Sequence, residues 1–329
     1  MDSLSVLILV VTLALLFDFS NGWHDAANAI ATVVSTQVLS PGRAVLLAGV
    51  LNVAGAYVST AVAKTVGGEI VDPVAINQSA VGAALIGALT WNLLTLLWGL
   101  PTSSSHALLG GMVGAAFAQG GLVAIKLTGL LTVLQALLLS PFLGFLVGYC
   151  FLVFIFWLAR RAQRGRANLA FRRLQLVSSS LMAFSHGSND AQKVMGIITL
   201  ALVSGGMLDR VEVPSWVIAC CALAMGLGTL TGGWRIIRTL GMRIAKLEPV
   251  SGFAAETSAA LILLGTAHYG LPVSTTHTIA SSIMGVGSVR RFSAVRWGVS
   301  MQIVSAWVFT MPTAAMVAYL VNPLFQLLQ

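Results

Sequence analysis

Long apolar runs separated by short polar segments dominate this chain. The longest run, 122–158, contains a single charged residue, Lys126. Only 9% of the 329 residues are charged and 57% are hydrophobic, whereas soluble domains carry about 25% charged residues. Several runs reach or approach the roughly 20 apolar residues that cross a bilayer as a helix, and the short alternating segments of barrel strands are absent. The sequence therefore predicts an all-α polytopic membrane protein.

The polar segments between the apolar runs differ in charge. Segments 159–173, 234–250 and 288–296 are rich in Arg and Lys, whereas 64–78 and 204–215 contain acids and fewer cations. Because basic loops are retained in the cytoplasm, we expect the first three segments on the cytoplasmic side and the other two outside. Orientation in a lipid bilayer therefore explains the net charge of +8, and no nucleic-acid partner is expected.

The first apolar segment and the cysteines place further limits on the chain. The expected membrane segments are 4–35, 44–63, 79–100, 104–117, 122–158, 174–203, 216–233, 251–268, 276–287 and 297–321. The first of them lacks a basic n-region and follows Asp2, so we expect a retained helix and not a signal peptide. The three cysteines, at 150, 220 and 221, lie in apolar segments, which argues against a disulfide framework.

Two different motifs occur twice, in the same order. FSNGWHDAANAI at 19–30 aligns with FSHGSNDAQKVM at 184–195, an offset of 165 residues. PTSSSH at 101–106 aligns with PVSTTH at 272–277, an offset of 171 residues. The pattern predicts an internal duplication, which is typical of transporters with a site between the repeats. We divide the chain into a first repeat with its connecting helix at 1–158, a basic cytoplasmic linker at 159–173 and a second repeat at 174–329.

The loop charges also indicate how the repeats are folded. Since 234–250 and 288–296 are both basic, the chain between them must enter the membrane and return, with its turn near Leu271–Thr276. We expect PVSTTH, and by analogy PTSSSH, at the tips of re-entrant hairpins, where irregular backbone is tolerated only in protein or beside a wet cavity. If 122–158 crosses the membrane once, the repeats are inverted, and if it crosses twice they are parallel; we favour inversion.

The hairpin tips are candidate anion sites. Proline suits the first turn of a helix and Ser or Thr its cap, so each motif should start a half-helix whose free N–H groups attract anions. The hydroxyl donors are Ser103, Ser104, Ser105, Ser274, Thr275 and Thr276. Alternatively, these hydroxyls only bond to the preceding turn or join helices. His106 and His277 follow the hydroxyls, and for them we expect a supporting hydrogen-bonding role.

The other repeated motif places carboxylates inside apolar segments. Asp25 and Asp190 are therefore expected to be functional, because intramembrane carboxylates are costly. Neighbouring glycines and small polar residues favour a locally unwound helix whose carbonyls, with Asp25 and Asn28, could bind Na⁺. The alternative is a proton relay that includes His24. Asn189 is a further candidate for phosphate binding, and Gln192 and Asn92 are candidates for supporting residues.

The two acidic motifs differ at one position that bears on coupling. Asn28 aligns with Lys193, which lies three residues after Asp190 and can contact it on a helix. At most one of two symmetric cation sites then remains, so we favour protons over sodium as the coupling ion, although Lys193 could also contact the anion. Glu256 lies in another apolar segment and could relay protons.

These motifs resemble those of a known family. GWHDAANAIATVVST and HGSNDAQKVMGI are similar to the two halves of the signature of the inorganic phosphate transporter (PiT, or PHO4) family, and PTSSSH and PVSTTHTIASSIMGVG resemble its hairpin motifs. The resemblance implies inverted repeats with broken helices, and symport of inorganic phosphate with H⁺ or Na⁺ in a bacterial inner membrane. Some members move phosphate as a neutral complex with a divalent metal.

Position by position, the resemblance assigns roles. Asp25 and Asn28 match the acid and amide of the first signature, and Asn189 and Asp190 match those of the second. The hydroxyls at 103–105 and 274–276 match the anion-binding tips. His24 and Lys193 stand where the family usually or often has Asn, which puts sodium coupling in doubt.

We therefore expect a proton-coupled phosphate symporter that works by alternating access, with no covalent cofactor. A sodium-coupled phosphate carrier, a sulfate carrier of the same fold and a passive channel are the alternatives. A homodimer is left open. An intramembrane hydrolase using Ser105 or Thr276 with a histidine is a remote alternative, because neighbouring residues on a helix point apart and no G-x-S-x-G elbow is present. The chain is not expected to be an enzyme.

Overall fold

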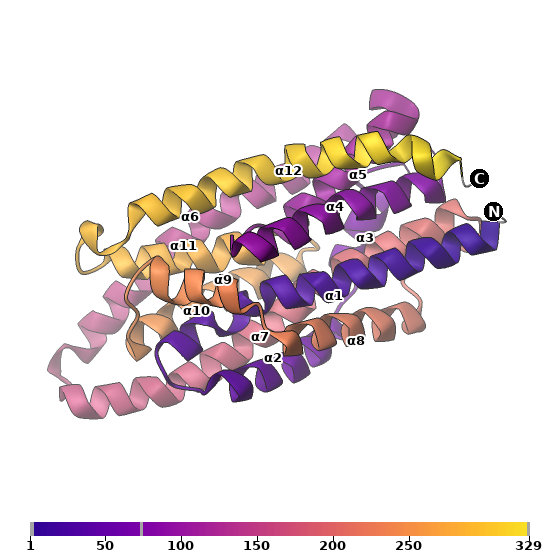
Figure 1. Cartoon of the computed structure of the whole chain (residues 1–329). Helices are drawn as coiled ribbons and strands as arrows, with labels where there is room; N and C mark the ends of the chain where they lie inside the picture. Colours follow the sequence, from indigo (N-terminus) through magenta and orange to yellow (C-terminus); the bar gives the residue numbers. More distant parts are fainter. Residues whose placement is uncertain (1–2, 73–74, 328–329) are drawn as a thin grey trace.

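The computed structural model describes residues 3–72 and 75–327. Within these ranges the chain forms an elongated bundle of α-helices without a named strand (Figure 1). Val71 and Ile125 form an isolated antiparallel bridge between two loops. The all-helical membrane fold expected from the sequence is therefore confirmed for the described residues.

Six helices occupy the first half of the chain and six the second. The first six are α1 (Ser3–Ser35), α2 (Pro41–Ala56), α3 (Ala61–Gly68), α4 (Gln78–Trp98), α5 (Ser104–Gly120) and α6 (Leu127–Leu158). The second six are α7 (Arg164–Ser204), α8 (Ser215–Thr231), α9 (Trp234–Arg238), α10 (Pro249–His268), α11 (Thr275–Ser288) and α12 (Trp297–Gln326). Short helical turns are η1 (Gly121–Ala124), η2 (Ala159–Arg161), η3 (Thr239–Arg243) and η4 (Phe292–Ala294).

Many of these helices are suited to a lipid bilayer. Among the described residues, six helices are long and apolar enough to cross a membrane, or up to eight spans if each of two bent helix pairs is one span. The bent pairs are α2 with α3, at 72°, and α8 with the segment 234–243, at 62°. They hold equivalent places in the two halves, and they are the broken helices of this fold. The protein is an integral membrane protein.

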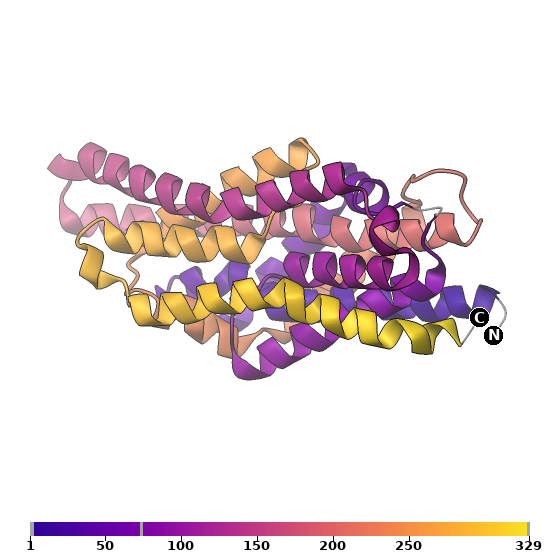
Figure 2. The ribbon, with the colours of Figure 1, turned by 90° about the horizontal axis from the view of Figure 1, so that it is seen from above.

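The course of the long helices indicates how the halves are related. α6 is one continuous helix that runs from one end of the bundle to the other, and α1 and α7 run in opposite directions (Figure 1). Both termini lie at the same end (Figure 2). Segment 122–158 thus crosses once, and we propose that 1–158 and 174–329 are inverted repeats. The halves also exchange partners, since α1 packs on α8 while α7 packs on α2.

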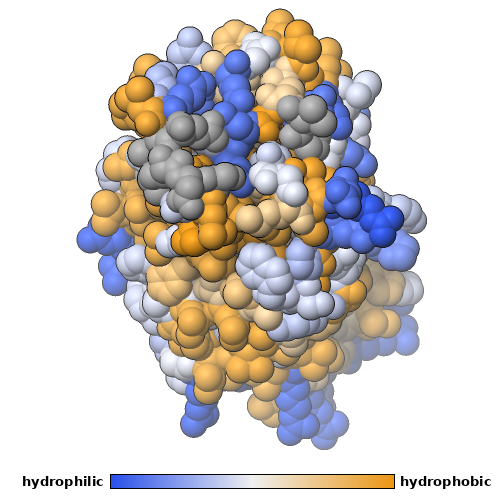
Figure 3. All heavy atoms as spheres, turned by 90° about the vertical axis from the view of Figure 1, so that its right-hand side faces the viewer, coloured by the Kyte–Doolittle hydropathy of each residue, from blue (hydrophilic) through white to orange (hydrophobic). Residues whose placement is uncertain are grey.

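Charge is distributed unequally between the two ends. Arg290 donates hydrogen bonds to Glu248, which joins two basic segments, and Arg172 of the third donates to the Gln37 carbonyl. These basic segments lie at the end of the bundle opposite the termini. At the terminal end, Lys126 donates to the Gly68 carbonyl, which joins loop 121–126 to the end of α3. The positive-inside rule places the basic end in the cytoplasm. Figure 3 views the terminal end, where hydrophilic side chains lie among apolar ones.

The basic segment between the two halves has secondary structure of its own. We expected 159–173 to connect the repeats as a polar loop. Instead η2 covers Ala159–Arg161 and α7 already begins at Arg164, so most of the basic segment is helical. Its arginines are good helix formers, and the segment extends α7 beyond the bundle.

The expected unwinding at the acidic motifs is wrong. α1 and α7 continue without a break through Asp25 and Asp190. The glycines of these motifs serve close packing instead: a Cβ on Gly22 would lie 2.2 Å from the Met225 carbonyl oxygen of α8, and one on Gly187 would lie 2.2 Å from that of Asn52 in α2. Small residues permit such close helix crossings in membranes, so no freed carbonyls are available there for a cation.

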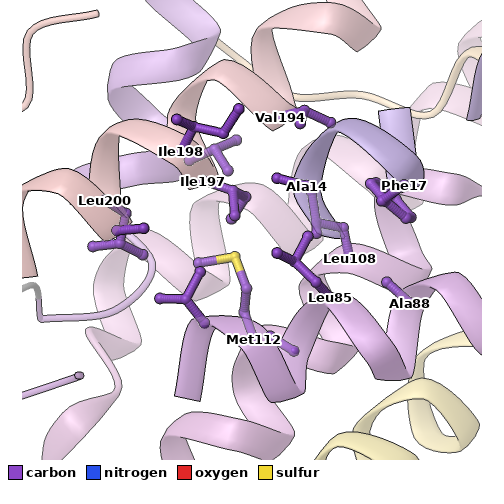
Figure 4. Packing of buried hydrophobic residues seen from close by; sticks show 14 of the residues in the cluster. Ala14, Phe17, Leu85, Ala88, Leu108, Met112, Val194, Ile197, Ile198 and Leu200 are labelled. Carbon is purple, nitrogen blue, oxygen red and sulfur yellow. The ribbon is translucent and has the colours of Figure 1, made fainter. Parts of the chain in front are cut away.

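Two apolar clusters enclose the middle of the bundle. One joins the N-terminal half of α1 with α4, α5 and the C-terminal half of α7, and the other joins the C-terminal half of α1 with α10 and α11. Figure 4 shows part of the first cluster, in which Ala14 and Phe17 of α1 lie close to Leu85 and Ala88 of α4. The polar motifs of α1 and α7 lie where the two clusters meet.

Candidate functional site

The two hydroxyl motifs start helices, as their sequences predict. The Ser103 side chain accepts a hydrogen bond from the His106 N–H at the start of α5, and Ser274 accepts one from the His277 N–H at the start of α11. Both serines are buried N-caps. They satisfy one backbone donor each, and the following hydroxyls are left for other partners.

The tips of the two hairpins lie against each other. Ser105 Oγ is 3.4 Å from the Val273 carbonyl oxygen, although the residues are 168 positions apart. The rings of His106 and His277 are 4.5 Å apart between centroids, and His277 stacks on Trp307 of α12 at 3.9 Å. His106 Nδ1 also lies 2.9 Å from Ser103 Oγ. The two histidines thus pack beside the hairpin tips, and one of them also contacts α12.

Asp25 receives hydroxyl groups from both tips. Ser104 of α5 donates to Asp25 Oδ2 at 2.9 Å, and Thr276 of α11 donates to Oδ1 at 3.3 Å. His24 Nδ1 lies 2.8 Å from the same Oδ1. One turn further along α1, Asn28 Nδ2 donates to the hydroxyls of Thr276, at 2.8 Å, and Thr275, at 3.2 Å. The first acidic motif is therefore bonded to both repeats of the hydroxyl motif.

Asp190 occupies a matching place on α7. Thr275 donates to Asp190 Oδ2 at 2.8 Å, and Lys193 contacts Oδ1 directly. The Lys193 ammonium also donates to Ser105 Oγ at 2.5 Å and to the Val273 carbonyl at 2.9 Å. The buried cation thus joins the second acid to both hairpin tips, as its spacing from Asp190 permits.

A further histidine completes the cluster. Ligand atoms of Asp25, His186 and Asp190 lie within 4.8 Å of one another, a grouping that could hold a metal ion. His186 Nε2 is 3.2 Å from Asp190 Oδ2. Sequence reasoning missed His186, although it lies four residues before Asp190 on the same helix face, within a motif already recognised as repeated.

The surroundings of His186 determine where its proton lies. Thr229 donates to the Met225 carbonyl, so its oxygen accepts from Asn52 Nδ2 at 2.8 Å. This orients Asn52 Oδ1 toward His186 Nδ1, at 3.0 Å. Because an amide oxygen only accepts hydrogen bonds, Nδ1 must be the donor and carry a hydrogen. In a neutral imidazole the lone pair of Nε2 would then face the Asp190 carboxylate. A proton on Nε2 or a cation between the groups removes this repulsion.

The remaining candidates have other surroundings. Gln192 accepts from the Val62 N–H at 2.9 Å, so it caps α3 at the helix break. Asn189 and Asn92 are buried, and among the described residues their side-chain atoms have no hydrogen-bond partner. His24 Nε2 lies 3.3 Å from the hydroxyl of Thr95. The hydrogen bond to Val62 thus gives Gln192 a structural role at the start of α3.

Glu256 lies in a separate polar group. Its carboxylate accepts from Thr32 at 2.5 Å, from Gln175 at 3.1 Å and from Ser178. The group joins α1, α7 and α10 on the cytoplasmic side of the hairpin tips. Its partners were missed in the sequence because single polar residues on long helices carry no signal of what they face.

The whole site is closed to both sides of the bundle. Side chains of the two acids, Lys193 and the hydroxyls at 104, 105, 275 and 276 are all buried, with Ser105 the most exposed of them at 7%. Apolar clusters cover both ends of this polar layer. An ion could reach it only after some of the surrounding helices move.

Comparison with known proteins gives a consistent result. A model of the phosphate transporter family (PHO4) matches residues 21–318. The "Probable low-affinity inorganic phosphate transporter" of Rhizobium meliloti (strain 1021) is 48% identical over 317 residues, 96% of this chain and 95% of that protein. The protein of the same name from Bacillus subtilis (strain 168) is 46% identical over 319 residues, 96% of each chain.

A solved structure has the same fold. "The sodium-dependent phosphate transporter" superposes with a TM-score of 0.89 at 24% identity and covers 99% of this chain and 100% of its own. At that identity the likeness establishes the fold alone. The family match and the two bacterial relatives extend over nearly the whole sequence. The chain therefore belongs to the phosphate transporter family.

Proposed function

We propose that this protein is a symporter that carries inorganic phosphate across the bacterial inner membrane together with protons, by alternating access. The observation that carries the proposal is the meeting of two hydroxyl-capped helix starts with Asp25, Asp190 and Lys193 in one buried layer. The family and the names of the relatives agree with phosphate as the transported anion.

Phosphate would bind between the tips of α5 and α11. Helix N-termini attract anions through their free N–H groups, and Ser104, Ser105, Thr275 and Thr276 add hydroxyl donors. These hydroxyls now donate to the two aspartates or contact Lys193. A phosphate oxygen would compete for the same hydrogens, while Lys193 would supply a positive charge.

The charges of the site support the co-transport of a cation. Two carboxylates and one ammonium give the layer a net charge of about −1 when the imidazoles are neutral. Phosphate adds one or two further negative charges, and an uncompensated charge in such surroundings costs several kcal/mol. Entry of at least one positive ion with phosphate would offset this charge.

Protons fit this requirement better than sodium in our proposal. Lys193 already occupies one flank of Asp190, and His24 and His186 lie beside the two acids as groups that exchange protons. The competing carrier is a Na⁺ symporter with the ion at Asp25 and Asn28, whose Oδ1 atom has no hydrogen-bond partner among the described residues. A divalent metal that accompanies phosphate would meet the same Asp25, His186 and Asp190 atoms.

A sulfate carrier and a hydrolase have weaker support. Sulfate has no O–H at neutral pH, whereas phosphate can donate one to an acceptor such as Asp25. A hydrolase would need a nucleophile beside a histidine, but Ser105 and Thr276 contact Lys193, Asp25 and Asn28 instead. A transporter assignment needs neither a nucleophile nor a bound cofactor.

Phosphate uptake into proteoliposomes tests the proposal directly. The purified protein is reconstituted, and pH and Na⁺ gradients are imposed separately at zero membrane potential. We expect accumulation of radiolabelled phosphate with acid outside, its loss on addition of an uncoupler, and weak competition by sulfate. Accumulation driven by Na⁺ alone would replace the proton with sodium, and equilibration without accumulation would indicate a channel.

A further inference from the structure

A fourth buried carboxyl lies outside the site described above. Asp18 is in α1, seven residues before Asp25, with 0% of its surface exposed. At 1.5 Å per residue this places it about 10 Å closer to the extracytoplasmic end of the helix. Asp18, Asn21, Asp25, Asn28 and Thr32 are spaced by three or four residues and so share one face of α1. All five are buried.

The surroundings of Asp18 differ from those of the other buried acids. Asp25 and Asp190 receive hydroxyls or an ammonium, and Glu256 has three donors. Asp18 lies against the thiol of Cys221 in α8 and near Asn21. Neither of its oxygens has a hydrogen-bond partner of ordinary geometry among the described residues. A buried carboxylate without a partner is costly, so further negative charge nearby should strongly disfavour the ionised form of Asp18.

The titratable groups around Asp18 are few. Cys221 of α8 is adjacent and the carboxyl of Asp190 in α7 is within electrostatic range, whereas α4 presents Leu85 and Ala88 to the preceding turn of α1 (Figure 4). Within the described ranges, no Lys or Arg donates a hydrogen bond to its carboxyl. By the repeat offset of 165 residues, its counterpart on α7 is Ala183. The Asp18 carboxyl thus has no acidic counterpart in the other repeat.

We propose that Asp18 binds a co-transported proton on the extracytoplasmic side of the phosphate site, and that phosphate and this proton favour each other's binding. The inference rests on the proposed function. Negative charge that enters the layer of Asp25 and Asp190 makes an ionised Asp18 less favourable, so phosphate promotes proton uptake there. By linkage, a proton on Asp18 strengthens phosphate binding by the same factor. Release of phosphate to the cytoplasm then lets the proton leave.

The test compares Asp18→Asn with the wild type in the same proteoliposomes. With one proton per phosphate, a pH difference of one unit supports about tenfold accumulation. Asparagine imitates the neutral acid, so the variant should still exchange labelled for unlabelled phosphate across the membrane, while its acid-driven accumulation falls to about the ratio seen without a gradient. Asp18→Glu should retain accumulation. Asp209→Asn, an exposed acid in the extracytoplasmic loop 205–214, is the matched control.

Each outcome decides between the inference and the proposed function. Asp18→Asn with normal acid-driven accumulation overturns the role of Asp18 and leaves phosphate symport intact. A folded Asp18→Asn that no longer binds or exchanges phosphate also overturns it, because the residue would then support the phosphate site. If wild-type uptake depends on sodium and Asp18→Asn uptake does not, Asp18 would be a sodium ligand, which would contradict its proposed role in proton binding. A wild type that moves no phosphate would instead refute the proposed function.

A second neutral variant covers a failure of Asp18→Asn to fold. Asp18→Ser also removes the titratable group and adds a hydroxyl that can donate to a helix carbonyl. Proton uptake per bound phosphate is measured by calorimetry in buffers of different ionisation enthalpy, on the wild type and on whichever neutral variant is folded. We expect the neutral variant to take up about one proton fewer per phosphate. Equal proton uptake would overturn the proposal.

Discussion

The ion pair of Lys193 and Asp190 allows a quantitative test of the buried layer. Lys193 is 3% exposed and Asp190 0%, so water does not screen the pair. Lys193→Gln would remove the positive charge from Asp190, from Ser105 and from the Val273 carbonyl, all of which it now contacts. Asp190→Asn would leave the ammonium buried without its counter-charge.

The expected size of the effect follows from the contacts. Breaking a buried pair by removing one partner costs about 3–5 kcal/mol. Asp190 would keep Thr275 and His186 as neighbours. The loss in free energy of unfolding for Lys193→Gln should therefore lie near the lower limit of this range, at about 3 kcal/mol. Asp190→Asn should cost a similar amount. The double variant has neither charge and should lose only about 1 kcal/mol, which gives a coupling free energy of about 5 kcal/mol.

Denaturant unfolding in mixed micelles would measure the free energy of unfolding for the four proteins of this cycle. The matched control is the cycle for Arg210 and Glu212, an ion pair whose side chains are 77% and 58% exposed. Exposed pairs contribute about 0–1 kcal/mol. A coupling for Lys193 and Asp190 as small as that of the control would refute the reasoning, because the layer would then be open to water.

Three further comparisons of variants test separate parts of the account. Ser104→Ala should weaken phosphate binding about tenfold, because one hydrogen-bond donor to the anion is lost. Ser103→Ala should lower the free energy of unfolding by about 1 kcal/mol, because a helix cap is lost, and should change phosphate affinity less than twofold. Equal losses of affinity in an equilibrium binding assay would contradict these separate roles. Gly22→Ala should lower the thermal midpoint, because its Cβ would meet a carbonyl at 2.2 Å, while Gly265→Ala, with nothing within 4 Å, should not. Glu256→Gln should slow uptake at least about tenfold with phosphate affinity within about twofold, and a parallel loss of binding would show that Glu256 supports the phosphate site.

Sequence reasoning predicted the parts of the fold that depend on local pattern. Apolar length gave the membrane class, and the duplicated Pro-Ser-His motifs gave the helix starts at Ser104 and Thr275. The basic segments around Arg290 and Lys246 correctly placed two loops at the same end. Each of these predictions used information contained within about one turn or one loop of the chain.

The parts that sequence reasoning missed depend on contacts between distant helices. Gly22 was interpreted as a sign of unwinding because the closeness of Met225 cannot be read from the sequence. Gln192 was predicted as a supporting residue, but its partner, the N–H of Val62 at the break before α3, could not be identified from the sequence. The hydrogen bond that orients His186 is made with Asn52, which is itself bonded to Thr229, and both residues lie on other helices.

The position of the bound anion tests the central claim most directly. Arsenate has the shape and charge of phosphate, and the anomalous scattering of arsenic locates it in crystals of the wild-type protein. The account predicts one strong peak between the tips of α5 and α11, within hydrogen-bond reach of Ser104 and Thr275. A peak only in the basic surface cavity of about 420 Å³ near Lys246 and Arg291, with none between the tips, would contradict it.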